Sequence, residues 1–381
     1  MRDTVPRRLA HTPFGDRPTT LLIRVRRYAC AHCGRTWRED MTQAAEPRGK
    51  ISHSGVGWAL RAVVRDHLTI ARVAEHLRVS WHTANDAVLT EGERLLVNDP
   101  HRFDGVTTIG VDEHAWRHVR FKEKYVTVII DLTPIREGTG PSRLLDLVPG
   151  RSKDVFRQWL KQQTPTFRAG IDVIAMDGFT GFKTAAAEVV PDATAIMDPF
   201  HVVKLAGQCV EKTRQRVQQD TLGHRGRRGD PLYQSRRTLL TGLDLLNPRQ
   251  FERINALFAT DDHVEVEMAW NVYQKVIAAY REKNKKKGAK KMRRLIEAIG
   301  TGVPAALVEI TKLGRTLRSR AADVLAYFDH PGTSNGPTEA INGRLEHLRG
   351  SALGFRNLDH YRLRSLLETG GFRPALHSQM R

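Results

Sequence analysis

Three acidic residues stand where carboxylates could hold a metal ion, and two of them belong to apolar segments. Asp112 lies within the segment IGVDE, and Asp177 ends a predicted strand within the segment VIAMDG. A carboxylate without a partner is costly to bury, and two carboxylates held close together need a cation. Hard oxygen ligands of this kind favour Mg²⁺ or Mn²⁺. Each aspartate could instead be an ordinary turn residue at the end of a strand.

The third acidic residue, Glu339, belongs to a segment that predicts a helix beginning near Asn335, and Pro337 suits its first turn. Helical spacing places Glu339 and Asn342 on one face. The opposite face is apolar and consists of Ile341, Leu345 and Leu348. The polar face could therefore look into a site while the apolar face packs against a sheet. Alternatively, Glu339 serves only as a first-turn carboxylate that favours the helix dipole.

Strands are predicted around both aspartates, because β-like segments alternate with turns and helices from residue 106 onward. The runs VTTIGVDEHAW, KYVTVIIDLTP and SRLLDLVPG predict three consecutive antiparallel strands. A helix capped by Ser152, the apolar strand IDVIAMDG, a second helix and the strand ATAIMD follow. We therefore predict an α/β fold with the order of a ribonuclease-H-like sheet. In such a sheet the strands of Asp112 and Asp177 lie side by side and parallel.

Asp198 and His201 follow the fifth predicted strand, in the segment DPFH. Asp198 could compete with Asp177 for the metal, but the fifth strand lies one place further from the first. We therefore treat Asp198, His201 and Asn342 as residues near the site, where they could orient the strand or the DNA. The alternative for the first two is a purely structural Asp–His pair.

Residues 51–100 predict a helix-turn-helix DNA-binding domain. Apolar residues recur at helical spacing from Ile70 to Leu77, a short turn follows, and Ser80 is a good N-cap for a second helix. The front of that second helix would meet base edges through Trp81, His82 and Asn85. The spacing is equally compatible with a tight pair of helices that has no DNA-binding role.

Cys30 and Cys33 form a CxxC pair, which is the geometry of half a zinc site. A structural zinc ion needs four ligands, and the remaining cysteine, Cys209, lies far away in a predicted helix. We interpret residues 1–50 as a partial zinc-ribbon-like segment. Zn²⁺ held at Cys30 and Cys33 is one interpretation, and a remnant without metal is the other.

The charge balance of the 381-residue chain indicates a polyanionic partner. Lys and Arg total 61 against 42 Asp and Glu, which gives a formal net charge of +19. Basic runs over 214–237 and 281–294 favour contacts with phosphates, although such runs also cover solvated helix faces. The sequence contains no apolar run long enough for a membrane span and too few cysteines for a disulfide framework. We expect a cytoplasmic, nucleoid-associated protein that handles nucleic acid.

The chain resembles bacterial insertion-sequence transposases of the ISL3 type, a family of DDE transposases. The resemblance rests on the CxxC pair and on the blocks GVDEHAW, MDGFTGFKTAAAEVVPDATAIMDPFHVVKLA and TSNGPTEAINGRLEHLRGSALGFRN. It implies that Asp112, Asp177 and Glu339 are the catalytic triad and the metal ligands. It also implies a catalytic domain over residues 101–381, with a helical insertion at about residues 205–330. Members of the family usually carry another cysteine pair upstream, and its absence here leaves zinc binding open.

The resemblance implies a transposase that binds the terminal inverted repeats of an insertion sequence. Two divalent ions at the triad would support cleavage of the transposon end and transfer of its 3′-OH into target DNA. Double-stranded DNA would be the partner, and joining two ends requires a homodimer or a higher oligomer. Two alternatives stay open: a catalytically inactive or domesticated DNA-binding regulator, and a structure-selective nuclease that cuts without joining.

Overall fold

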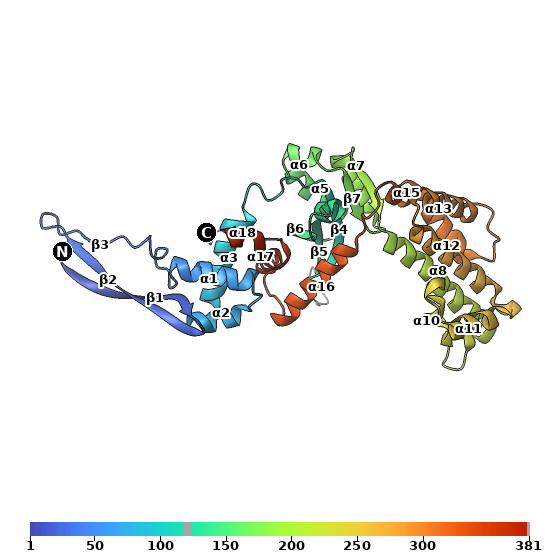
Figure 1. Cartoon of the computed structure of the whole chain (residues 1–381), viewed down its shortest axis with the longest axis horizontal. Coiled ribbons are helices and arrows are strands. Elements are labelled where there is room, and N and C mark those ends of the chain that lie inside the picture. The colour runs from blue at the N-terminus through green and yellow to red at the C-terminus, as the bar shows by residue number, and fades with distance from the viewer. Residues whose placement is uncertain (118–123, 379–381) are drawn as a thin grey trace.

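The computed structural model of the chain describes residues 1–117 and 124–378. The molecule is elongated, with a long β-hairpin at one end, a sheet in the middle and a bundle of helices at the other end (Figure 1). The C-terminal helices return to the middle, where they lie beside the sheet. None of the described helices is both long and apolar enough to cross a membrane.

The N-terminal segment forms a three-stranded antiparallel sheet of β1 (Asp3–Phe14), β2 (Arg17–Ala29) and β3 (Thr36–Arg38). Gly15 supplies the left-handed backbone of the first turn, at a φ of 59°. Leu9 is buried on the inner face, whereas many of the alternate residues are exposed. The interpretation of residues 1–50 from sequence did not include this hairpin, because its strands are rich in arginine rather than in apolar residues.

Three helices follow: α1 (His53–Val64), α2 (Ile70–Leu77) and α3 (Trp81–Gly92), which continues as a π-helical turn over Glu93–Val97. The turn between α2 and α3 contains Arg78 in a left-handed conformation, with a φ of 51°. The Ser80 hydroxyl accepts a hydrogen bond from the Thr83 amide at 3.2 Å. The predicted pair of helices and its Ser80 N-cap are thus confirmed.

The central sheet contains five strands in the order β6–β5–β4–β7–β8. They are β4 (Thr108–Ala115), β5 (Tyr125–Asp131), β6 (Arg143–Pro149), β7 (Val173–Met176) and β8 (Thr194–Met197). The pairs β4–β5 and β5–β6 are antiparallel, whereas β4–β7 and β7–β8 are parallel. The five strands and the α/β class are as predicted, and their order is the one expected of a ribonuclease-H-like sheet.

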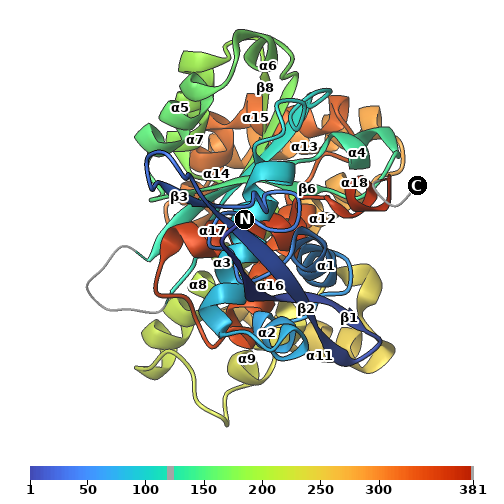
Figure 2. The same ribbon diagram turned by 90° about the vertical axis from the view of Figure 1, so that its left-hand side faces the viewer.

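Helices cover both faces of this sheet (Figure 2). One face carries α5 (Lys153–Gln162) and α7 (Thr180–Val189), and the other carries α16 (Gly336–Ser351) and α17 (Leu358–Thr369). Two short helices, α4 (Thr133–Glu137) and α6 (Pro165–Ala169), lie in the connections. On β5, Ile129 packs with the α5–α7 core, while Val128 and Ile130 pack with the α16–α17 core.

The C-terminal helices α17 and α18 (Arg373–Ser378) join the N-terminal helices to the sheet. Tyr361 and Leu367 of α17 belong to one apolar core with α1, α2, α3, β5 and β6. Gly92 of α3 allows this approach, because a Cβ atom there would lie 2.7 Å from the Leu367 side chain. The helix pair α2–α3 and the sheet therefore share one continuous core.

A helical insertion between β8 and α16 has a separate apolar core. Its helices are α8 (Pro199–Leu222), α9 (Pro231–Gln234), α10 (Arg236–Leu239), α11 (Pro248–Phe258), α12 (Val264–Arg281), α13 (Lys285–Gly300), α14 (Val308–Ser319) and α15 (Ala321–Asp329). Short 3-10 turns lie at Leu243–Leu245 and Asp261–His263. The helices expected in this region are confirmed, and they begin directly after β8.

The first arginines of the basic run 214–237 do not form a phosphate-binding surface. Arg214 is fully buried, and its guanidinium donates hydrogen bonds to Glu211 and Gln218. Arg216 forms an ion pair with Glu309 at 3.0 Å. Both guanidinium groups therefore stabilise the insertion from within, and the interpretation of this part of the run as a phosphate track is wrong.

Candidate active site

Asp112 and Asp177 lie at the same edge of the sheet, because their strands are parallel neighbours. The register pairs Val111 of β4 with Met176 of β7, so the two aspartates are the next residues on the two chains. The Phe179 amide donates a hydrogen bond to Asp177 Oδ1 at 2.8 Å, which turns the chain away after β7. The structure therefore brings together the two aspartates that the sequence singled out.

Asp112 is the more constrained of the two carboxylates. Its Oδ1 accepts from the Glu113 amide at 2.8 Å, and its Oδ2 accepts from Asn342 Nδ2 at 3.0 Å. Burial raises the pKa of Asp112 to about 7, and repulsion from Asp177, Glu113 and Glu339 adds to this despite the hydrogen bond from the Glu113 amide. Burial and the neighbouring carboxylates therefore disfavour the charged form of Asp112 as long as no cation is near.

Helix α16 carries Glu339 and crosses β4 at close range. Thr338, on the inner side of the helix, is buried against Gly110, where a Cβ atom would lie 2.9 Å from the Thr338 hydroxyl. Asn335 precedes the helix and donates through Nδ2 to the Val111 carbonyl at 3.4 Å. Glu339 is exposed, so its carboxylate is accessible, and its role as the third ligand stays a prediction.

The Asn342 side chain provides the direct link between α16 and Asp112. Its Nδ2 donates to the carboxylate, while its Oδ1 is buried without a hydrogen-bond partner among the described residues. A buried amide oxygen without a partner is a costly arrangement that is commonly retained for a functional reason. This residue, predicted to be near the site, therefore contacts the candidate triad directly.

Asp198 follows β8, and both of its carboxylate oxygens take part in structural hydrogen bonds. It is only 4% exposed, and its two oxygens accept hydrogen bonds from the His201 amide at 3.0 Å and the Asn335 amide at 2.8 Å. Burial raises the pKa of Asp198, and these two hydrogen bonds oppose the rise. Asp198 thus caps α8 and at the same time fixes the start of α16. We call this contact the Asp198–Asn335 latch.

His201 contacts Asp198 through its backbone, not through its ring. The ring lies against Gly178, where a Cβ atom would be 2.4 Å from His201 Nε2. Burial lowers the pKa of His201, and the negative charge of Asp177 opposes this effect. Asp198 and His201 are therefore joined by a helix N-cap bond, while the imidazole lies next to the loop after Asp177.

A buried ion-pair network also joins the insertion to this loop. Arg320, which precedes α15, donates to the Gly178 carbonyl at 3.2 Å and to Asp323 at 2.5 Å. Asp323 in turn pairs with Lys183 of α7 at 2.8 Å. Sequence reasoning missed these residues, because nothing in their spacing shows that α15 lies beside β8 and the start of α7.

The donor set at the edge fits a hard divalent cation. Asp112, Asp177 and Glu339 are carboxylates, and carboxylate oxygens are the ligands that such a cation prefers. Within residues 1–117 and 124–378, however, no three His, Cys, Asp or Glu side chains lie close enough together to hold a metal ion. The three carboxylates therefore do not form a closed ligand group among the described residues, and metal binding here stays a prediction.

The exposed front of α3 differs from the prediction at one position. Trp81 is 47% exposed and His82 is also exposed, with the two rings in an edge-to-face contact at 5.3 Å. Asn85 is only 2% exposed. It lies on the same helical face as the buried Leu89, four residues later, and this spacing is a signal that could have excluded it. The prediction that Asn85 contacts DNA is therefore wrong.

Cys30 and Cys33 lie in the turn between β2 and β3. The Gly34 amide donates to the Cys30 carbonyl at 3.0 Å, and Gly34 adopts a φ of 67°. Backbone amides of Cys33 and His32 lower the pKa of the Cys30 thiol. Among the described residues no third ligand joins the pair in a metal-binding group, so zinc binding stays a prediction.

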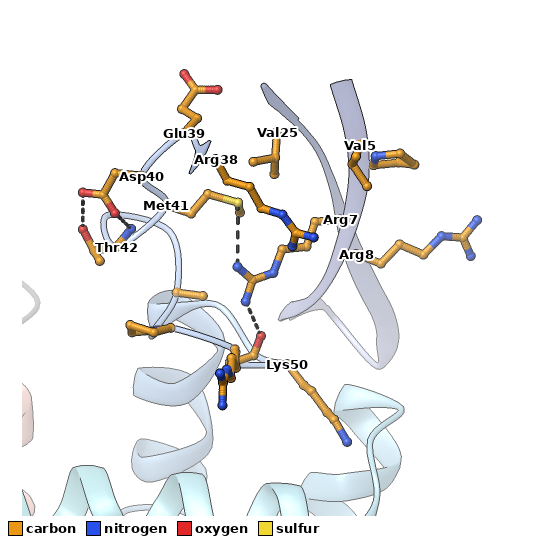
Figure 3. A pocket seen from close by; sticks show the side chains of 15 residues that line it. Val5, Arg7, Arg8, Val25, Arg38, Glu39, Asp40, Met41, Thr42 and Lys50 are labelled. Carbon is orange, nitrogen blue, oxygen red and sulfur yellow. Dashed lines mark hydrogen bonds between the residues drawn. The ribbon is translucent and has the colours of Figure 1, made fainter. Parts of the chain in front are cut away.

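A hollow of about 700 Å³ lies between the hairpin and the segment that leads to α1. Figure 3 shows Arg7 and Arg38 pointing into it, while Arg8 points away. Arg7 is held in place by a 2.8 Å hydrogen bond to the Gly49 carbonyl. The Asp40 carboxylate accepts hydrogen bonds from both the amide and the hydroxyl of Thr42. The hollow therefore presents mainly positive charge.

Comparison with known proteins first gives the class. The chain belongs to the ISL3-type family of DDE transposases, because the family model, described as a transposase, matches residues 109–365. This match contains Asp112, Asp177 and Glu339. Membership supports a role in DNA transposition with DNA as the partner, and divalent metal ions are in general use in this family.

Individual relatives agree with this class. The transposase for insertion sequence element IS1001 of Bordetella parapertussis is 23% identical over 96% of this chain and 84% of its own length. The transposase for insertion sequence element IS1557 of Mycobacterium tuberculosis is 23% identical over 80% of this chain and 69% of its own. Among solved structures, the Drosophila P element transposase strand transfer complex matches with a TM-score of 0.44 at 12% identity, covering 82% of this chain and 90% of that one.

Proposed function

We propose that this chain cuts the ends of an insertion sequence and joins them to target DNA at the edge formed by Asp112, Asp177 and Glu339. The observation that carries the proposal is the pairing of β4 with β7, which places both aspartates at one edge. Asn342 then links this edge to the helix of Glu339 through its hydrogen bond to Asp112. The ribonuclease-H-like strand order supports the same assignment.

The three carboxylates would hold Mg²⁺ or Mn²⁺. Such an ion, when bound, activates water and stabilises the charge that develops on the phosphate oxygens. The protein supplies the positions of the ligands: the Glu113 amide and Asn342 orient Asp112, and the Phe179 amide orients Asp177. The Asp198–Asn335 latch fixes the start of the helix that carries Glu339.

The reaction itself needs no nucleophile from the protein. Cleavage adds water to the phosphorus atom and breaks the bond to the 3′ oxygen, which leaves a free 3′-OH. In strand transfer this 3′-OH attacks a phosphate of the target, and the displaced strand leaves with its own 3′-OH. In both steps the oxygen of water or of the 3′-OH bonds directly to phosphorus while a 3′ oxygen leaves. No covalent intermediate between protein and DNA is therefore required.

DNA binding is assigned to the N-terminal part of the molecule, beside the β-hairpin. The helix pair α2–α3 would read the terminal inverted repeats, with Trp81 and His82 exposed at the front of α3. The neighbouring hollow, with Arg7 and Arg38 inside it, would contact phosphates. Two ends must be joined in one reaction, so we propose a homodimer or a higher oligomer on DNA.

Cleavage and strand transfer of DNA that carries the ends of the element test the proposal. Asp112→Ala, Asp177→Ala and Glu339→Ala should each abolish both reactions while end binding is retained. Asp172→Ala is the matched control, because this exposed aspartate precedes β7 at the opposite end of the same strand. Wild-type protein that binds the ends without cutting would indicate a DNA-binding regulator, and cutting without joining would indicate a nuclease.

A further inference from the structure

A second groove opens directly beside Asp177. It has a volume of about 850 Å³, and its lining includes Glu113, Lys124, Tyr125, Arg151, Asp177 and Phe179. These residues come from the ends of β4 and β7, the start of β5 and the turn between β6 and α5. The groove is therefore formed at the same edge of the sheet as the candidate triad.

Phe179 presents an aromatic surface to this groove. It is 41% exposed, although it lies only two residues after Asp177. The amide of Phe179 is fixed by its hydrogen bond to the Asp177 carboxylate, and its ring is supported by an edge-to-face contact with Phe182 at 5.0 Å. An exposed phenyl ring held by its own backbone beside a catalytic carboxylate is a rigid platform for another flat, apolar surface.

Two cations line the groove together with this ring. The Arg151 guanidinium lies 3.9 Å from the centroid of Tyr125, and Lys124 Nζ lies 5.1 Å from the same centroid. Arg151 also pairs with Glu113 at 3.3 Å, but both side chains are about half exposed. An exposed ion pair of this kind contributes little, so Arg151 can exchange Glu113 for a phosphate.

We propose that this groove holds an unpaired nucleotide of the DNA strand that flanks the cleaved bond. Its base would stack on Phe179, and its phosphate would contact Arg151 and Lys124. A base offers its full face only when it has left the duplex stack, which explains why a ring, and not a hydrogen-bonding side chain, is exposed here. The inference rests on the proposed function, because it needs the cleaved phosphate at Asp177, and it implies that the DNA opens locally where it is cut.

The first test measures cleavage of two forms of the same element end. One form is fully paired, and the other carries a mismatch at the nucleotide next to the cleavage point. Phe179→Ala should slow cleavage of the paired end about tenfold, because one stacking contact is lost. The mismatch should restore most of this rate, because the base is already unpaired. The control Phe251→Ala, at an exposed phenylalanine on α11, should cut both forms like the wild type.

The second test measures binding without cleavage. A forked duplex with an unpaired strand and a blunt duplex of equal length are the two probes. Phe179→Ala and Arg151→Ala should each weaken binding of the fork by about fivefold to tenfold and leave binding of the blunt duplex unchanged.

Three results would overturn the inference: equal slowing of Phe179→Ala on both ends, full activity of that variant on the paired end, or equal loss of fork and blunt binding. A wild type that cuts neither end, yet prefers the fork in a manner dependent on Phe179, would instead refute the proposed function alone.

Discussion

Asp177 and Asp198 occupy equivalent places on neighbouring parallel strands, yet their surroundings differ. The register pairs Met176 of β7 with Met197 of β8, so each aspartate is the next residue after its strand. Asp198 is buried, and both of its oxygens accept backbone hydrogen bonds. Asp177 is only partly buried, accepts from the Phe179 amide and lines an open groove.

The difference indicates that the two aspartates have different roles, one in binding a metal ion and the other in holding the fold. A carboxylate whose oxygens are occupied by backbone amides has little capacity left for a metal ion. One that faces a groove beside Asp112 and Glu339 keeps that capacity. The protein therefore uses Asp198 to position α16, and we expect Asp177 to serve as the ligand.

The largest expected effect is the loss of cleavage in Asp177→Asn. This substitution keeps the size of the side chain and removes the negative charge, so cleavage should fall by about a thousandfold or more. The free energy of unfolding should stay the same or rise slightly, because repulsion with Asp112 is relieved. Single-turnover cleavage of a labelled element end and urea denaturation at pH 8 measure the two quantities. Cleavage at the wild-type rate would remove Asp177 from the site.

Asp198→Asn should show the opposite pattern. The amide can accept from only one of the two backbone N–H groups and directs its own NH₂ toward the other. We expect the free energy of unfolding to fall by about 2 kcal/mol, while the folded fraction keeps measurable cleavage. Asp192→Asn, at an exposed position between α7 and β8, is the control in urea denaturation. Unchanged stability together with abolished cleavage would exchange the roles of Asp177 and Asp198.

Asn342→Ala tests the side chain that links α16 to the Asp112 carboxylate. Its loss removes one hydrogen bond from Asp112 and one buried amide oxygen that lacks a partner in the described structure. Cleavage should therefore fall about tenfold, with little change in stability. The concentration of Mg²⁺ needed for half-maximal cleavage should rise, because Asp112 is less well oriented. A fall in stability with an unchanged Mg²⁺ requirement would make Asn342 a packing residue only.

The sheet could be predicted because its signals are local. Apolar runs, turn residues and the Ser152 cap lie within short segments, and three strands followed by two helix–strand units are the succession of a ribonuclease-H-like sheet. Gly110 carried a further signal, since a glycine inside a predicted strand indicates close approach of another backbone. Here the approaching element is α16.

The division of roles between Asp177 and Asp198 could not be predicted. Both aspartates follow apolar strands. Asn335, whose amide donates a hydrogen bond to Asp198, lies 137 positions further along the chain. The ion pairs of Asp323 with Arg320 and Lys183 could not be predicted either, because they depend on how the insertion packs against β8. Long-range contacts of this kind leave no periodic pattern in the sequence.

The smallest effects are expected for substitutions on α3, where Trp81 is exposed and Asn85 is buried. Trp81→Ala and His82→Ala should each weaken binding of the terminal repeat by about fivefold, or about 1 kcal/mol, because single contacts at a protein–DNA interface contribute at this level. Asn85→Ala should leave the affinity unchanged, because Asn85 is buried beside Leu89 and cannot reach a base. Fluorescence anisotropy with a labelled repeat, at one fixed salt concentration, measures all three variants. A loss of affinity in Asn85→Ala without any loss of stability would mean that α3 turns to expose this residue when DNA binds.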